Sequence, residues 1–221
     1  LRRLVELAGR LTDVTMPGNR VTGAVSPLLP GDLSVLPEPR AAEAERLRQR
    51  GLTLLRRGGS ALVVLAGGMA TRMGGVVKAL VPAVPGRTFL ALRLAERAAL
   101  EREVGREVPL WFMTSAATDG KIRAALGGEL DGYRTAVFPQ ALSLRLTREG
   151  HLFRDARGEL SPHARGHGDL VDALRDSGLL DAFAARGGLT LTVGNLDNLG
   201  ATLDPLLIGF HVDHGKPVTC E

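Results

Sequence analysis

The chain has 221 residues, of which 44% are hydrophobic, and this is enough for one substantial α/β core. The formal net charge is +4, but the cations are spread along the chain among acidic residues, with one Trp and one Tyr. A nucleic-acid surface needs cations gathered on one face with aromatics between them, so we expect no nucleic-acid partner.

Cysteine usage and hydropathy indicate a cytoplasmic protein without a membrane segment. The one cysteine, Cys220, cannot form an internal disulfide, and no apolar run approaches the ~18 residues of a membrane span. The chain starts at Leu1 without Met, and residues 217–221 have the pattern of a strand that has just begun. We therefore expect part of the working protein to lie beyond Glu221. The oligomeric state is left open.

The first fifty residues predict a helix and a connector that packs on the core. Apolar residues at helical spacing predict a helix over residues 1–11. Five of the 12 prolines fall in residues 14–40, and because proline fixes φ and removes a backbone donor, this stretch is expected to be extended. Residues 41–57, rich in Ala, Glu, Arg and Leu, predict a further helix closed by Gly58 and Gly59.

Strands and helices alternate through residues 51–221, which we interpret as the N-terminal part of one α/β domain. Apolar runs predict strands at residues 61–66, 108–115, 135–139 and 189–193, the first and last of them buried. Helical patterns cover residues 88–104, 118–126, 169–185 with a break near Gly178, and those after Asp204 and Pro205. Residues 142–153 predict a hairpin. The alternation predicts a doubly wound, mainly parallel sheet.

Polar and glycine residues follow four of the predicted strands. They are residues 67–74 after the first strand, 113–115 after the second, Gln140 after the third and 195–198 after the last. In open α/β sheets, ligands bind outside the carboxyl ends of the strands, where such loops converge. We therefore expect these segments to form one ligand site.

The glycine-rich turn from Leu65 to Lys78 reads LAGGMATRMGGVVK and matches neither common phosphate motif. It lacks the GxGxxG of dinucleotide sites, and Gly74 is not followed by the Lys of a P-loop. Its backbone donors can nevertheless approach a triphosphate closely, helped by the charges of Arg72 and Lys78. Only three of the 28 cations are lysines, so Lys78 at the end of this turn indicates a specific role.

Two polar clusters have plainer interpretations. His163, His167 and Asp169 could be taken for zinc ligands, but no Cys lies nearby and the spacing is not that of a helical His pair. The segment Asn-Leu-Asp-Asn at residues 195–198 is also good turn material, so Asp197 as a turn residue alone remains an alternative.

A series of motifs resembles the UDP-sugar pyrophosphorylases, the family of UTP:glucose-1-phosphate uridylyltransferases and UDP-N-acetylglucosamine pyrophosphorylases. The turn LAGGMATRMG with Lys78 is followed in order by PLWFMTS, FPQ, RGHGDLVDAL, SGLL and VGNLDNLGATLDP. The resemblance covers residues 51–210, and GHGD together with NxDN is specific. It implies a Rossmann-like, glycosyltransferase-A-like nucleotidyltransferase fold, a mixed and mainly parallel sheet flanked by helices, and formation of UDP-sugar and pyrophosphate from UTP and a sugar-1-phosphate.

The resemblance also implies roles for single residues toward the nucleotide. Gln140 is expected to read the uracil edge, and Gly166 to approach the nucleotide closely. Arg72 and Lys78 are expected to stabilise charge on the departing pyrophosphate. Backbone contacts to uridine and phosphates are expected from Leu65, Ala66, Gly67 and Gly68.

Three further residues receive roles from the same resemblance. His167 is expected near the α-phosphate or the sugar phosphate, and Asn195 at the sugar or its phosphate. Asp197 is expected to hold Mg²⁺ that bridges the phosphates. The chain departs from the family at Ala70, where Gly is usual, and at Val77, where Pro precedes the Lys. A non-catalytic nucleotide or UDP-sugar binding protein on the same fold, and an NAD-linked oxidoreductase on a similar sheet, are the alternatives.

Overall fold

A computed structural model describes residues 23–29, 33–70 and 75–220. The helix expected over residues 1–11 and the side chain of Arg72 lie outside these residues. The chain forms two compact units, one of residues 1–35 and 142–165 and the other of residues 36–141 and 166–221. The domain boundary expected near residue 50 stays a prediction.

The larger unit is built on a four-stranded sheet, as the alternating pattern predicts. Its strands are β1 (Ser60–Leu65), β6 (Leu110–Thr114), β7 (Thr135–Pro139) and β10 (Thr190–Asn195). They lie in the order β10-β1-β6-β7, and every neighbouring pair is parallel. The predicted doubly wound, mainly parallel sheet is confirmed.

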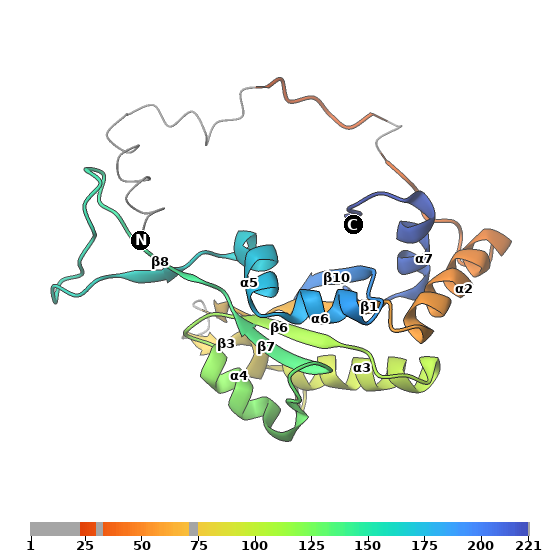
Figure 1. The fold of residues 1–221 in the computed structure, drawn as a ribbon, viewed down its shortest axis with the longest axis horizontal. Coiled ribbons are helices and arrows are strands. Elements are labelled where there is room, and N and C mark those ends of the chain that lie inside the picture. Colours follow the sequence, from red (N-terminus) through yellow and green to blue (C-terminus); the bar gives the residue numbers. More distant parts are fainter. Residues whose placement is uncertain (1–22, 30–32, 71–74, 221) are drawn as a thin grey trace. The chain divides into compact units, whose positions relative to one another are not determined.

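Helices cover both faces of this sheet. Figure 1 shows α3 (Phe89–Val104) and α4 (Asp119–Leu126) on one face, and α5 (Leu170–Asp176) and α6 (Leu179–Ala185) on the other. Alternate residues of β1 divide between the two layers, so that Val64 packs in the α3–α4 core and Val63 in the α5–α6 core. Because β1 is buried on both faces, its sequence after the buried Ser60 is an unbroken apolar run.

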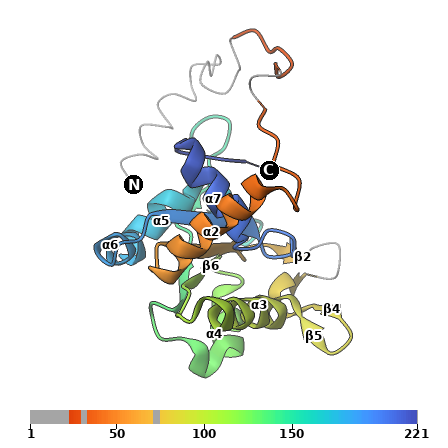
Figure 2. The ribbon, with the colours of Figure 1, turned by 90° about the vertical axis from the view of Figure 1, so that its right-hand side faces the viewer.

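Two further helices, α2 (Ala42–Arg56) and α7 (Pro205–His214), pack against each other (Figure 2). Both begin or end where the sequence indicates. Gly58 follows α2 with φ +75°, a conformation that glycine adopts without strain. The Asp204 carboxylate caps α7 by accepting a 2.7 Å hydrogen bond from the Leu206 amide, with Pro205 in the first turn.

The crossing of α2 and α7 brings backbone against backbone. A Cβ atom at Gly51 would lie 1.9 Å from the Pro205 carbonyl oxygen, and one at Gly209 would lie 1.9 Å from that of Leu47. Only glycine fits at these two positions, since the atoms that a side chain would meet are backbone atoms that cannot rotate away.

Two local expectations differ from the structure. The apolar run at residues 189–193 predicts a buried strand, but β10 is an edge strand with one neighbour, and Val193 is 43% exposed. In the smaller unit, β8 (Leu142–Leu144) pairs with β9 (Pro162–Ala164) and not with residues near 153. The hairpin predicted over 142–153 forms over residues 145–153, where Leu146 bridges Leu152 and the Phe153 amide donates to the Arg145 carbonyl at 2.9 Å. Its first residues pair with β9 instead, because a second turn at residues 155–158 returns the chain to β8.

Short elements connect the larger ones. The ribbons β2 (Met69–Ala70) with β3 (Val76–Val77) and β4 (Pro82–Val84) with β5 (Arg87–Thr88) are antiparallel and precede α3. Single 3₁₀ turns are η4 (Lys78–Leu80), η5 (Gly127–Glu129) and η6 (His167–Asp169). Among the described residues, no helix has both the length and the apolar character to cross a bilayer.

We expect Gly209→Ala to lower the free energy of unfolding by about 1 to 3 kcal/mol, because the added methyl group forces α2 and α7 apart. Urea denaturation measures this change. Gly120→Ala is the matched control, since Gly120 lies in α4 and a methyl group added there would meet nothing within 4 Å. This control should be neutral or stabilise by up to about 1 kcal/mol. Equal stability of the two variants would contradict the close crossing.

Candidate nucleotide and phosphate site

The strand order places the expected ligand crevice at the carboxyl ends of β1 and β10. From β1 the chain moves through β6 to β7 on one side, and it returns to β10 on the other side of β1. In open α/β sheets, ligands bind at the point where the strand order reverses in this way. Leu65 and Asn195 are partners in the register of the two strands, so the glycine loop and the loop with Asp197 begin side by side.

Lys78 and Asp197 form a direct ion pair in this region. The Lys78 ammonium lies 2.9 Å from the Asp197 carboxylate, and both side chains are partly exposed. The hydrogen bond from Lys78 holds the pKa of Asp197 below its ordinary value, so the carboxylate is ionised at neutral pH. Lys78, expected at the pyrophosphate, and Asp197, expected at the metal ion, are therefore in direct contact.

The backbone before Lys78 keeps the course that a proline would give it. Val77 stands where the resembling family has Pro, and its φ is −69°. Proline fixes φ at about −65°, so this departure leaves the direction of the chain into Lys78 unchanged. Ala70, the other departure, lies in β2 and pairs with Val76.

Gln140 joins the glycine loop to the turn at Gly166. It is buried, and its Oε1 accepts a 2.8 Å hydrogen bond from the Gly166 amide, which fixes the orientation of the side-chain amide. A Cβ atom at Gly67 would lie 2.3 Å from Gln140 Nε2, so the Gln140 amide packs directly over Gly67. Gly166 has φ +85°, which favours glycine at that position. Three residues predicted from separate motifs are therefore in contact.

The remaining predicted residues differ in how they face this region. The Ala66 amide already donates to the Met113 carbonyl at 2.8 Å, whereas Gly68 is exposed and a Cβ there would meet nothing within 4 Å. Close approach of a ligand is therefore open at Gly68, whereas Gly67 is covered by the Gln140 amide and the Ala66 amide already has an acceptor. The side chains of His167 and Asn195 are exposed.

Sequence reasoning placed Ser115 only within an expected ligand segment, weighed Asp169 only as a zinc ligand, and did not consider Arg93. Ser115 Oγ donates to the Gly67 carbonyl at 2.9 Å, and Asp169, which is buried, accepts from the Ala141 amide at 2.5 Å. Both lie inside quoted motifs, at PLWFMTS and RGHGDL, and that position was the available signal. Arg93 is buried in α3 below the loop that carries Asp197, and its one sequence signal is an Arg on the apolar side of a helix.

The site fits a metal ion only together with a bound phosphate. Among the described residues, no group of three or more His, Cys, Asp or Glu side chains could hold a metal ion. Asp197 supplies one ionised oxygen donor at the crevice. Mg²⁺ typically binds one or two carboxylates with substrate phosphates and water, so Asp197 meets the requirement on the protein side.

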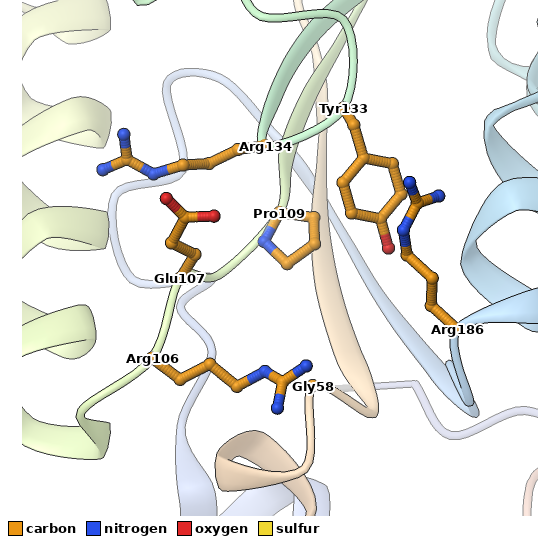
Figure 3. A pocket seen from close by; sticks show the side chains of 7 residues that line it. All are labelled: Gly58, Arg106, Glu107, Pro109, Tyr133, Arg134 and Arg186. Carbon is orange, nitrogen blue, oxygen red and sulfur yellow. The ribbon is translucent and has the colours of Figure 1, made fainter.

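A cavity of the larger unit lies at the opposite end of the sheet (Figure 3). It has a volume of about 450 Å³ and is lined at the amino ends of β6 and β7 by Pro109 and Arg134. Helices α2, α3 and α6 end here, and Arg106 and Arg186 follow two of them, where cations offset the negative helix ends. Arg134 is paired with Glu101 at 2.7 Å. The arginines of this cavity pair with a nearby carboxylate or offset the negative ends of helices. We therefore do not assign the cavity to the nucleotide and phosphate site.

The parallel sheet, the reversal of its strand order at β1 and the helices on both faces define the class of the protein, a doubly wound α/β domain. The sequence profile of the family described as UTP–glucose-1-phosphate uridylyltransferase matches residues 33–221, and the chain belongs to this family.

Curated relatives agree with that membership. The UTP–glucose-1-phosphate uridylyltransferase of Saccharomyces cerevisiae is 34% identical over 167 residues, which are 73% of this chain and 33% of that protein. The enzyme of the same name from Solanum tuberosum is 34% identical over 65% of this chain and 31% of its own length. The chain spans about a third of the length of the curated relatives it matches.

Solved structures confirm the fold expected from the resemblance. The UDP-glucose phosphorylase of Trypanosoma brucei matches with a TM-score of 0.65 and 26% identity, over 74% of this chain and 36% of that chain. The uridine diphosphate N-acetylglucosamine pyrophosphorylase from the same organism was solved with an inhibitor. It matches with a TM-score of 0.67 and 22% identity, over 78% of this chain and 38% of that chain. The Rossmann-like nucleotidyltransferase fold is therefore shared.

We expect Lys78→Met to raise the pKa of Asp197 toward its ordinary value of 3.8, because the variant removes the hydrogen bond that lowers it most. Carbon-13 NMR titration of the aspartate carboxyl groups measures the shift. Lys121→Met, which removes an exposed lysine on α4, is the control and should leave the Asp197 titration unchanged. An Asp197 pKa that stays low in Lys78→Met would show that the ion pair is absent in solution.

Proposed function

We propose that the chain carries the UTP-binding part of a uridylyltransferase site, in a protein that forms UDP-sugar and pyrophosphate from UTP and a sugar-1-phosphate. The observation that carries the proposal is the contact of Gly67, Gln140 and Gly166 at the sheet edge that also holds the Lys78–Asp197 pair. The curated relatives are named for glucose-1-phosphate, which favours this substrate over N-acetylglucosamine-1-phosphate.

The proposed chemistry needs few reactive side chains. An oxygen of the sugar phosphate attacks the α-phosphorus of UTP, the bond from that phosphorus to the bridging oxygen of the β-phosphate breaks, and pyrophosphate leaves with the electron pair. The attacking group is already an anion at pH 7, so no general base is required. Positioning and charge stabilisation provide the catalysis.

The side chains around the crevice divide this work. Gln140 keeps its Oε1 on Gly166 and offers the Nε2 donor to a uracil carbonyl, while the backbone of Gly67 and Gly68 lies against the nucleotide. Lys78 exchanges its carboxylate partner for phosphate oxygens when UTP binds. His167 and Asn195, both exposed, contact the sugar phosphate, and Arg72 adds positive charge from the glycine loop.

Mg²⁺ is the cation that we propose for this site. Released from Lys78, the Asp197 carboxylate would hold it together with phosphate oxygens of the nucleotide. When bound, the ion neutralises negative charge on the phosphates. Asp197 then serves two states, as the partner of Lys78 without nucleotide and as a metal ligand with it.

Pyrophosphate release tests the proposal. The full-length protein is supplied with UTP, Mg²⁺ and a panel of sugar-1-phosphates, and we expect release with glucose-1-phosphate at least. UTP binding without turnover would support a non-catalytic nucleotide-binding protein instead. Tighter binding of NADH than of UTP would support an oxidoreductase, and either result would overturn the uridylyltransferase.

We expect Lys78→Ala to lower turnover by one to three orders of magnitude, since a charge contact to the departing pyrophosphate is worth on the order of 2 to 4 kcal/mol. Steady-state kinetics at saturating UTP measure the loss. Lys121→Ala on α4 serves as the control for removing a lysine and should turn over at the parent rate. A Lys78→Ala enzyme as fast as the control would reduce Lys78 to a surface cation.

We expect Gln140→Glu to reduce the preference for UTP over CTP by about tenfold or more, because it removes the Nε2 donor to the base while an oxygen remains for the Gly166 amide. The ratio of kcat/KM for the two nucleotides is the measurement. Gln140→Ala should lose the same preference and also stability, since it leaves the Gly166 amide unpaired. Unchanged discrimination in both variants would remove Gln140 from base recognition.

A further inference from the structure

Arg93 is a buried cation that the core of α3 does not require. Its side chain is 0% exposed, on a helix whose other buried positions include Leu90 and Val104. Removing a guanidinium from water costs several kcal/mol unless hydrogen bonds and an opposite charge compensate for it. An aliphatic residue would fill the same position at lower cost, so the contacts of Arg93 need an explanation.

Those contacts converge on the loop that carries Asp197. Arg93 Nη1 donates to the Ala201 carbonyl at 3.0 Å, and Nη2 donates to the Asn195 carbonyl at 3.2 Å and to the Asn198 carbonyl. The Glu96 carboxylate, 2.8 Å from Nη1, supplies the opposite charge. One planar guanidinium thus binds carbonyl groups on both sides of Asp197, a geometry that a lysine ammonium does not reproduce.

Among the described residues, the other polar restraints on the loop are the hydrogen bond from the Leu196 amide to the Leu65 carbonyl at 3.3 Å, the Lys78–Asp197 pair and two hydrogen bonds within it. Within it, the Asn198 amide donates to the Asn195 carbonyl at 3.1 Å, and the Ala201 amide donates to the Asn198 carbonyl at 3.0 Å. These are the same carbonyl groups that Arg93 binds. Leu196 and Ala201 are buried and anchor the apolar side, while Asp197 and its following residues are exposed. The course of the exposed part therefore depends on Arg93.

We propose that Arg93 is a positioning residue that holds the 195–201 loop in the conformation in which Asp197 faces the crevice. It does not reach the crevice itself, because it is fully buried beneath the loop. Its charge also adds, after the hydrogen bond from Lys78, to the low pKa of Asp197. The consequence for metal and sugar-phosphate binding rests on the proposed function, whereas the consequence for the loop does not.

A second buried arginine on the same helix provides a matched comparison. Arg97 lies one turn after Arg93 and is 5% exposed. It donates to the Thr135 hydroxyl and, at 3.0 Å, to the Glu129 carboxylate. Neither partner belongs to the 195–201 loop. Substitution of Arg97 thus reports the cost of losing a buried arginine from α3 without a direct effect on the loop.

The test uses Arg93→Lys and Arg97→Lys in the full-length protein. Hydrogen exchange followed by mass spectrometry measures protection of residues 194–203, and titration with Mn²⁺ in the presence of UTP measures cation affinity. We expect both variants to lose stability toward urea, but only Arg93→Lys to exchange about tenfold faster in this loop and to bind Mn²⁺ about tenfold more weakly. Equal loop protection in the two variants would overturn the proposal.

A milder variant covers the case in which Arg93→Lys does not fold. Glu96→Gln keeps Arg93 but weakens its charged partner, and we expect faster exchange in the same loop by a smaller factor. If exchange in the loop is unchanged in Glu96→Gln and Arg93→Lys is unfolded, the proposal is overturned, and Arg93 contributes only to the stability of the core. Hydrogen exchange does not require turnover. An inactive parent protein would therefore refute the proposed uridylyltransferase activity, while the exchange rates of residues 194–203 would still test the role of Arg93.

Discussion

Burial of β1 on all sides is the constraint on which the other features depend. Its side chains pack against helices on both faces of the sheet, and its edges are hydrogen-bonded to β6 and β10. A strand in this position is mainly apolar, and the polar groups that a ligand requires lie where the strand ends. The glycine loop begins at that point, and the return of the chain to β10 places the Asp197 loop beside it.

Local patterns predicted most of the elements because their causes are local. The strand expected at residues 135–139 is β7 to the residue, and the helix break expected near Gly178 separates α5 from α6. The errors concern partners. Strand β10 has one neighbour, and β8 pairs with β9. Both facts depend on which strands meet in space, and hydropathy along one segment carries no information on this.

The same division holds for the candidate site. The rule that ligands bind at strand ends selected Gln140 and Asp197 from the sequence, and the motifs added Gly166 and Lys78. The contacts among these residues needed coordinates, since Gln140 meets Gly166 and Lys78 meets Asp197 across 26 and 119 positions of the chain. Arg93 was not identified from the sequence, because the helical pattern does not distinguish a buried arginine from an exposed one. Its hydrogen-bond acceptors are needed to make that distinction.

The glycine crossing of α2 and α7 has a consequence for how the chain tolerates change. The Asp197 loop is fixed at one end by β10 and at the other by α7, and α7 is seated on α2 through Gly51 and Gly209. Helix α2 therefore supports, through α7, a loop that follows it by more than a hundred residues in the chain. A side chain at position 51 or 209 would push the two helices apart, and it would therefore act on the Asp197 loop from a distance.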